Sequence, residues 1–206
     1  MRRFVIVGHN VDPGGEFSLN DLCGGAGRLD VLLRCVSSAF FLSHGIRRDV
    51  EAYLVLPGRS HGSDVGKTLR FIGSELRYLN PDERSTAALV RTALMKKLDG
   101  EAAEEKRSTP GIYISKKGFG DLLAALPGPV WLVEDWQPWP AGGLPGESTF
   151  YLSDHHDFSP EEQALLAKSG ARRLSLGPIS LHSHHCITVA HWLLDGAPPP
   201  APEGGG

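Results

Sequence analysis

The chain has 206 residues, of which 41% are hydrophobic and 22% are charged, and its formal net charge at pH 7 is -3. These proportions are typical of a globular domain and exclude an intrinsically disordered chain or a membrane-embedded one. A chain of this length buries roughly 70% of its unfolded surface, so we expect one domain over residues 1–195. The small negative charge gives no general attraction to nucleic acid, so binding to RNA would require a local cluster of basic residues.

We expect neither a membrane-spanning segment nor a signal peptide. No apolar run approaches the roughly 20 residues that span a bilayer, and the apolar segment near the N-terminus is too short for a signal peptide. We therefore expect a cytoplasmic protein without a membrane partner. Residues 196–206, GAPPPAPEGGG, cannot pack into a core, and we expect them to be a disordered tail.

The chain has three cysteines: Cys23, Cys35 and Cys186. An odd number without a CxxC pair argues against a disulfide framework and against a thiolate zinc site. We expect reduced thiols.

Apolar periodicity predicts the first elements of the fold. A buried strand over residues 3–7 is followed by a glycine-rich loop over 9–27 and a helix over 28–44. A loop of that length is uncommon in a compact domain unless it has a function. Residues 49–56 end in a continuous apolar run, which is typical of a central strand.

The middle of the chain mixes loops with a helix whose start is well marked. Residues 57–67 read as a loop, and 69–79 could hold two short strands around Gly73 and Ser74. Asn80 as N-cap, Pro81 and Glu83 then predict a helix that runs to residue 98. Residues 99–110 are highly charged and read as a solvated connection.

Strands and helices alternate through the rest of the chain. We predict strands over 112–115, 130–134 and 149–152 and helices over 119–126 and 160–168, the second with Ser159 as N-cap. Such alternation predicts an α/β fold with a mostly parallel sheet. Ligands of such sheets gather outside the carboxyl ends of the strands.

Residues 174–194, LSLGPISLHSHHCITVAHWLL, contain the most informative turn. A short apolar segment leads through Gly177 and Pro178 into a run with three histidines and then a helix. Spacing alone fits an ordinary strand-turn-helix connection. Gly177 would also let the backbone approach a ligand, and the amides before the helix would attract an acceptor group.

Three blocks of the sequence carry a family resemblance, in chain order: residues 17–56, RYLNPDERSTAALV over 77–90, and SLGPISLHSHHC over 175–186. In this order they resemble the archaeal-type tRNA (pseudouridine(54)-N1)-methyltransferase family (TrmY-like) of the SPOUT class. The resemblance implies a SPOUT-type, mostly parallel sheet with a C-terminal trefoil knot. It also implies S-adenosyl-L-methionine as cofactor, tRNA with pseudouridine at position 54 of the T loop as substrate, methylation of that base at N1, and a homodimer.

Matching motifs assign candidate cofactor contacts, which the resemblance places on three loops and the last helix: Leu132, Ser153, Leu176, Gly177, Leu181 and Cys186. Ser153 stands where we expect glycine in many relatives, although a backbone contact would survive that change. Cys186 could equally be a buried structural thiol, the usual fate of a lone cysteine.

Candidates for the substrate side combine arginines with short acidic side chains. The guanidinium group matches phosphate oxygens, and carboxylates or amides can accept from base N–H groups. We take Asp21, Arg28 and Asp30 as candidates for catalysis, where a carboxylate would receive the N1 proton or Arg28 would stabilise the developing anion. The RNA-binding candidates are Asn20, Arg34, Arg47, Arg48, Arg77 and Arg84. Surface ion pairing, for example between Arg28 and Asp30, is the alternative reading.

Other functions stay open on the sequence alone. A SPOUT enzyme acting on another RNA such as rRNA, or a non-catalytic RNA- or nucleotide-binding module, would share these motifs. The histidines, chiefly His182, His184 and His185 with His155 and His156, could also indicate a metal-dependent hydrolase. That signal is weak because no HExxH motif is present, and we predict no metal site.

Overall fold

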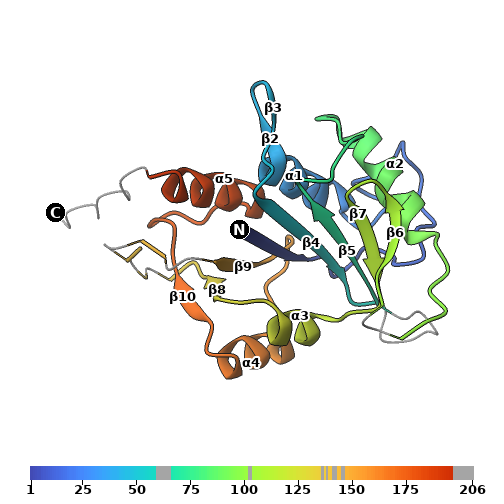
Figure 1. Ribbon diagram of the computed structural model, residues 1–206. Coiled ribbons are helices and arrows are strands. Elements are labelled where there is room, and N and C mark those ends of the chain that lie inside the picture. Colours follow the sequence, from blue (N-terminus) through green and yellow to red (C-terminus); the bar gives the residue numbers. More distant parts are fainter. Residues whose placement is uncertain are drawn as a thin grey trace.

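The computed structural model describes residues 1–58, 66–101, 104–135, 137, 139–140, 143–144 and 147–196. Most of the loop expected over 57–67 and nearly all of the tail expected over 196–206 lie outside these residues. In the described part, one large sheet is covered by helices on both faces, as Figure 1 shows. None of these described helices is both long and apolar enough to cross a bilayer.

The first strand occupies the centre of the sheet. β1 (Arg2–Val7) lies between β4 (Val50–Leu56) and β9 (Ser148–Ser153) and runs parallel to both. Its last four residues are fully buried, because both edges and both faces of the strand are covered. The sheet is thus organised around an apolar run that the sequence predicts.

The sheet has a parallel and an antiparallel half, in the order β10-β8-β9-β1-β4-β5-β7-β6. β8 (Pro129–Leu132) and β10 (Arg172–Leu174) extend the parallel half beyond β9. The antiparallel half consists of β5 (Lys67–Ile72), β7 (Ile112–Ser115) and β6 (Lys106–Thr109). The prediction of an α/β fold with a mostly parallel sheet is confirmed.

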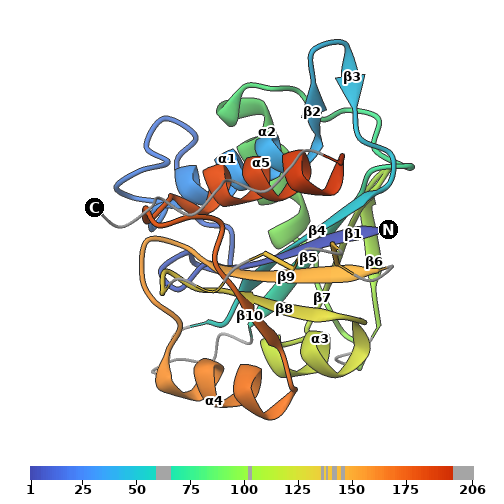
Figure 2. The ribbon, with the colours of Figure 1, turned by 90° about the vertical axis from the view of Figure 1, so that its left-hand side faces the viewer.

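Helices divide between the two faces (Figure 2). One face carries α1 (Leu29–Phe40), α2 (Glu83–Leu94) and α5 (Ser183–Leu194); the other carries α3 (Phe119–Ala125) and α4 (Pro160–Lys168). Each layer has its own hydrophobic cluster, and the larger one lies under α1.

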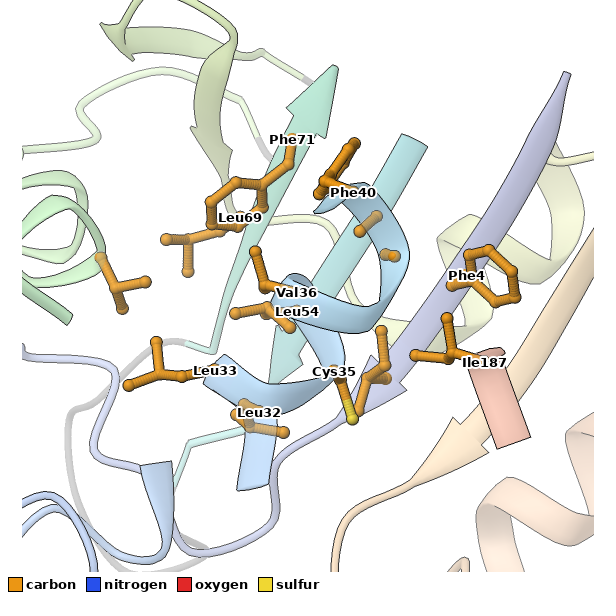
Figure 3. Packing of buried hydrophobic residues seen from close by; sticks show 14 of the residues in the cluster. Phe4, Leu32, Leu33, Cys35, Val36, Phe40, Leu54, Leu69, Phe71 and Ile187 are labelled. Carbon is orange, nitrogen blue, oxygen red and sulfur yellow. The ribbon is translucent and has the colours of Figure 1, made fainter. Parts of the chain in front are cut away.

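The larger cluster joins α1 to the central strands. Figure 3 shows Val36 and Phe40 of α1 beside Leu54 of β4 and Phe71 of β5. The rings of Phe40 and Phe71 have centroids 6.4 Å apart. Ile187 of α5 belongs to the same cluster, so the last helix is anchored on the first one.

Several element boundaries differ from the sequence-based predictions. α1 ends at Phe40, because Phe41 adopts an extended conformation and starts the hairpin of β2 (Phe41–Leu42) and β3 (Gly45–Ile46), which projects from the body in both ribbon views. One strand, β5, replaces the two expected over 69–79, and the chain turns where a Cβ on Gly73 would lie 2.3 Å from the carbonyl oxygen of Arg47.

Two further predictions were wrong in the middle of the chain. Asp82, not Asn80, caps α2: its carboxylate accepts from the Ser85 amide at 2.8 Å, and the helix ends at Leu94. The charged connection over 99–110 contains β6, which pairs with β7 at the sheet edge, where charged side chains are tolerated. By contrast, the Ser159 capping box on α4 is confirmed.

The long loop between β1 and α1 is confirmed as irregular structure. It ends in two successive left-handed residues, Gly27 (φ 63°) and Arg28 (φ 65°). A Cβ on Gly27 would lie only 2.0 Å from the carbonyl oxygen of Asn10, so only glycine allows the two ends of this loop to touch.

Candidate functional site

A cavity lies at the carboxyl ends of β8, β9 and β10, where the sequence predicts a ligand. It has a volume of about 540 Å³ and is closed on one side by the loop before α5. That volume falls within the range of small-molecule sites, roughly 300–1,000 Å³. Five of the six predicted cofactor residues line it: Leu132, Ser153, Leu176, Leu181 and Cys186.

Gly177, the sixth, lies in the same loop without lining the cavity. Its φ of 156° is a conformation that residues with a side chain rarely adopt, and a Cβ built there would meet no described atom within 4 Å. The Ser175 hydroxyl holds the turn by donating to the Gly177 carbonyl oxygen at 2.7 Å. Gly177 therefore allows the backbone conformation of this loop, and no close contact with another described residue requires a glycine there.

Ser153 offers an unused hydrogen-bonding group to the cavity. Its Oγ is buried and has no hydrogen-bond partner among the described residues. Its carbonyl oxygen is occupied, because the Ser183 hydroxyl of α5 donates to it at 2.5 Å. Buried polar atoms normally have a hydrogen-bond partner, so the Ser153 hydroxyl indicates that a bound ligand supplies one.

The cavity wall combines apolar and acidic side chains. Leu132, Leu152 and Leu176 suit a flat, apolar group such as a purine ring, whereas Glu134 and Asp157 suit a cationic one. Both acidic side chains are exposed. The same wall also contains the basic side chain of Arg173, so it can accept a ligand that combines an apolar part with groups of both charges.

Cys186 is a neutral thiol in this wall. Burial raises its pKa to about 11, and its Sγ lies 3.6 Å from the carbonyl oxygen of Leu181. A thiol that keeps its proton at neutral pH is a poor nucleophile, so Cys186 contributes packing to the cavity. A packing role agrees with the prediction that Cys186 contacts the cofactor, and the neutral thiol argues against a nucleophilic role.

The first turn of α5 faces the same loop. Its N-cap, His182, makes no side-chain hydrogen bond to the first amides of the helix. Free amides at a helix N-terminus favour acceptor groups such as a carboxylate. The start of α5 can therefore bind the anionic end of a ligand in the cavity.

His9 is a site residue that the sequence analysis missed. Its Nδ1 lies 3.1 Å from Asp154 Oδ1 and its Nε2 lies 3.0 Å from Glu162 Oε2, while its backbone amide donates to Asp154 Oδ2 at 2.8 Å. The hydrogen bonds to Asp154 and Glu162 raise the pKa of His9 to about 9. No spacing signal could reveal this cluster, because the partners are 145 and 153 residues away.

A second cavity of about 450 Å³ adjoins the first. His9, Asn10, Asp12, Glu16 and the glycines of the long loop line it. Asn10 also contacts the first cavity's wall, since its Nδ2 lies 2.9 Å from His156 Nε2. The His9–Asp154 pair therefore forms part of the partition between two adjacent cavities.

Arg28 and Arg34 share one buried carboxylate. Asp30 is 3% exposed; the Arg28 Nε donates to it at 3.0 Å, and Arg34 forms a second, shorter contact. Burial raises the pKa of Asp30, but the hydrogen bond and charge of Arg28 and the charge of Arg34 outweigh burial and lower it. The predicted ion pair between Arg28 and Asp30 is confirmed, yet both guanidinium groups stay more than a third exposed.

Asp21 holds the long loop together. Its carboxylate accepts from the amides of Gly24 at 2.9 Å and Gly25 at 2.8 Å. Asn20 beside it is exposed. Both lie in the same loop that lines the second cavity through Gly24 and Gly25.

The remaining arginine candidates are not gathered at one place. Arg47 pairs with Asp195 at 2.6 Å, and Arg48 donates to the carbonyl oxygens of Gly73 and Leu76, so both lie near the amino ends of the parallel strands. Arg77 follows Leu76 in the chain and lies at the same end of the strands. Arg84 follows Glu83, which pairs with Arg34, so it lies on the side of Arg28 and Arg34.

The histidines around α5 lie close to one another, with His182 and His184 stacked and His185 tilted against both. The rings of His184 and His185 have centroids 4.0 Å apart, and burial lowers the pKa of His184. Among the described residues, no group of three or more potential ligands could hold a metal ion. A metal-dependent hydrolase therefore has no geometric support in this part of the chain.

The comparisons with known proteins agree with this site. The model of a family described as "Putative SAM-dependent RNA methyltransferase" matches residues 1–198. The chain belongs to this family of RNA methyltransferases that depend on S-adenosylmethionine, so the family resemblance and the cofactor predicted from the sequence are confirmed.

Relatives within the family are similar over nearly their full length. A tRNA (pseudouridine(54)-N(1))-methyltransferase of Methanocella arvoryzae is 46% identical, over 95% of this chain and 99% of the relative. The protein of the same name from Haloarcula marismortui is 50% identical, over 96% and 98%.

A solved structure shows the same fold. Archaeoglobus fulgidus Nep1, bound to S-adenosylhomocysteine, matches with a TM-score of 0.64 over 94% of this chain and 98% of its own, at 15% identity. The SPOUT-type fold is confirmed; the trefoil knot, and the single domain over 1–195, stay predictions.

Proposed function

We propose that this protein transfers a methyl group from S-adenosylmethionine to N1 of pseudouridine 54 in the T loop of tRNA. The observation that carries the proposal is the cavity at three carboxyl strand ends, with the unpartnered Ser153 hydroxyl in its wall. The choice of acceptor follows the names of the archaeal relatives, which are similar over almost the whole chain.

The cavity residues suit the cofactor part by part. The leucines Leu132, Leu176 and Leu181, together with Cys186, would hold the adenine ring, and Ser153 would donate to or accept from the ligand. The amides at the start of α5 would face its carboxylate. When bound, the cofactor supplies an activated methyl group on a sulfonium.

The protein's task on the acceptor side is to align N1 and remove its proton. We place the acceptor base toward the second cavity, which shares the His9 partition with the first. Arg28 would face the negative charge that develops on the base, and Asp30 would hold Arg28 in place. Asp21 would maintain the conformation of the loop. The candidate acceptors for the N1 proton are Asp21 and Asp30, together with Asp12 and Glu16, which line the second cavity.

The RNA backbone would cross the exposed arginines beside the site. Arg28, Arg34 and Arg84, with Asn20 in the adjacent loop, are the candidates that the fold brings to this side. We rank Arg47, Arg48 and Arg77 lower because they lie near the amino ends of the parallel strands, away from the cavity at the carboxyl ends. The proposal also includes a homodimer, which a monomeric mass in light scattering would refute, and a cytoplasmic location.

The test is transfer of a labelled methyl group to two matched T-arm transcripts, one with uridine and one with pseudouridine at the target position. We expect transfer to the pseudouridine transcript alone, because uridine has carbon in place of the reacting N1–H position. Transfer to neither, with calorimetric binding of S-adenosylhomocysteine intact, would refute the tRNA target and retain the cofactor site.

A further inference from the structure

Three distant segments meet at His9. It follows β1, Asp154 follows β9, and Glu162 lies in the first turn of α4. The side chain of His9 is 19% exposed, against 2% for Asp154 and 12% for Glu162. The imidazole is thus the bridge between two largely buried carboxylates from different elements.

The geometry requires protons on both ring nitrogens. A carboxylate can only accept hydrogen bonds, and each nitrogen of His9 lies within 3.1 Å of a carboxylate oxygen, so each nitrogen must donate. A neutral ring would leave one nitrogen lone pair facing a carboxylate. The bridge is therefore complete only as an imidazolium cation.

The two carboxylates also hold the backbone of the cofactor loops. Asp154 Oδ1 accepts from the His156 amide at 2.9 Å, and Glu162 Oε2 accepts from the Ser159 amide at 2.8 Å. Ser153 and Gln163, next to Asp154 and Glu162 in the chain, both line the cofactor cavity. Movement of either carboxylate would therefore reshape the cavity wall.

We propose that His9 is a positioning residue, which ties the loop after β9 to the start of α4 and so maintains the cofactor cavity. This inference rests on the proposed cofactor site, and His9 itself need not touch the cofactor. Removing its charge would leave two buried carboxylates facing each other, and their repulsion would push Ser153 and α4 apart.

The inference implies that cofactor affinity falls when His9 loses its proton. The groups that face it are Asp154 and Glu162, with His156 beside them at a ring-centroid distance of 6.2 Å and His155, whose Nδ1 lies 3.8 Å from Asp154 Oδ1. Because the two carboxylates raise the pKa of His9 to about 9, the loss is expected as the pH rises through that value.

The test compares His9→Gln with His44→Gln, a matched change at an exposed turn in the β2–β3 hairpin. Calorimetry with S-adenosylhomocysteine at pH 7.5 should give about tenfold weaker binding for His9→Gln and an unchanged affinity for His44→Gln. Between pH 8 and 10 the wild-type affinity should fall toward that of His9→Gln. Titration of the ligand's own amino group affects all variants equally, so it cancels in this comparison.

A second variant covers a failure of His9→Gln to fold, which circular dichroism would reveal. His9→Lys keeps a positive charge with a higher ordinary pKa, about 10.4, so the loss of affinity should move to higher pH. Equal affinities and equal pH profiles for folded His9→Gln and wild type would overturn the inference. Binding without methyl transfer to RNA would refute the proposed reaction and leave this inference standing; no binding by the wild type would overturn both.

Discussion

Arg28 is the non-glycine residue with a left-handed backbone in the described part of the chain. Such a conformation costs roughly 1 kcal/mol or more for a residue with a side chain, and it persists only where the surroundings fix it. Here the fixed points are the buried carboxylate of Asp30 and the close contact between Gly27 and Asn10. The guanidinium group that this backbone carries pairs with Asp30 and stays partly exposed.

Replacing Arg28 by glycine separates its chemical role from its backbone role. Arg28→Gly removes the side chain and relieves the strain, while Asp30 keeps Arg34 as a partner. We expect methyl transfer to fall about tenfold or more, equivalent to about 1.4 kcal/mol in the barrier, with binding of S-adenosylhomocysteine within about twofold of wild type. Steady-state kinetics and calorimetry measure the two effects.

The control for this change is Arg77→Gly, at an exposed arginine that we rank low among the RNA contacts, which should lower transfer by less than about twofold. If Arg28→Gly instead weakened cofactor binding and spared transfer from the bound cofactor, the acceptor and cofactor sides of the site would be exchanged.

At the scale of elements, Gly27 fixes how the long loop closes on the start of α1. Gly27→Ala would place a Cβ 2.0 Å from a backbone oxygen in addition to straining a left-handed residue. Gly170 has a similar φ, 72° against 63°, and open space around it, so Gly170→Ala carries the strain alone. The pair therefore separates the close contact from the backbone strain.

We expect Gly170→Ala to lower the free energy of unfolding by about 1 kcal/mol and Gly27→Ala to lower it by about 3 kcal/mol. Urea unfolding followed by circular dichroism measures both. Equal losses would mean that the contact between Gly27 and Asn10 is not tight in solution.

Local patterns predicted the elements whose identity is decided by their own residues. The apolar runs that became β1 and β4, and the Ser159 cap of α4, needed no tertiary information. The hairpin after α1 and the edge strand β6 were missed because pairing with another segment decides them. Tertiary pairing can override a helical or polar pattern.

The same division holds for the site. The resemblance located the loops that form the cavity, five of whose predicted contacts line it. Composition could not tell which arginines lie on the same side of the molecule. Arg47 and Arg48 were therefore grouped with Arg28, although their hydrogen-bond partners lie near the amino ends of the parallel strands. His9 was missed because its role exists only in the folded chain.

At the scale of the whole molecule, two histidines oppose each other in the pH dependence of stability. Burial, with the charges of Arg47 and Arg2, lowers the pKa of His191 to about 4. The carboxylates of Asp154 and Glu162 raise the pKa of His9 to about 9. The ordinary value of histidine in an unfolded chain is about 6.5.

The signs follow from which state binds more protons. Between pH 6.5 and 4 only the unfolded chain protonates at His191, so stability falls as the pH decreases. Between pH 6.5 and 9 only the folded chain keeps the proton on His9, so stability falls as the pH increases. Each effect amounts to at most about 3 kcal/mol, and less for His9 because solvent screens its partly exposed ring.

We therefore expect the free energy of unfolding to be greatest near pH 6.5. Below about pH 4.5 the carboxylates with lowered pKa values, including Asp195 at about 2, add to the loss. Urea unfolding at intervals from pH 4 to 10 measures the curve, and His9→Gln should flatten its alkaline side. A curve that keeps rising beyond pH 8 would contradict the assignment of His9.

The position of β1 between β4 and β9 also determines the order in which the sheet can form during translation. The ribosome makes β1 first, and β4 soon covers one of its edges, but residues 57–147 must be translated before β9 can cover the other. At 5–20 residues per second that interval lasts roughly 5–20 s, during which a buried strand of the finished sheet has an open edge. The cavity loops after β9 and β10, and α5, emerge later still. The cofactor can therefore stabilise only a nearly completed chain, and the nascent half must resist aggregation without it.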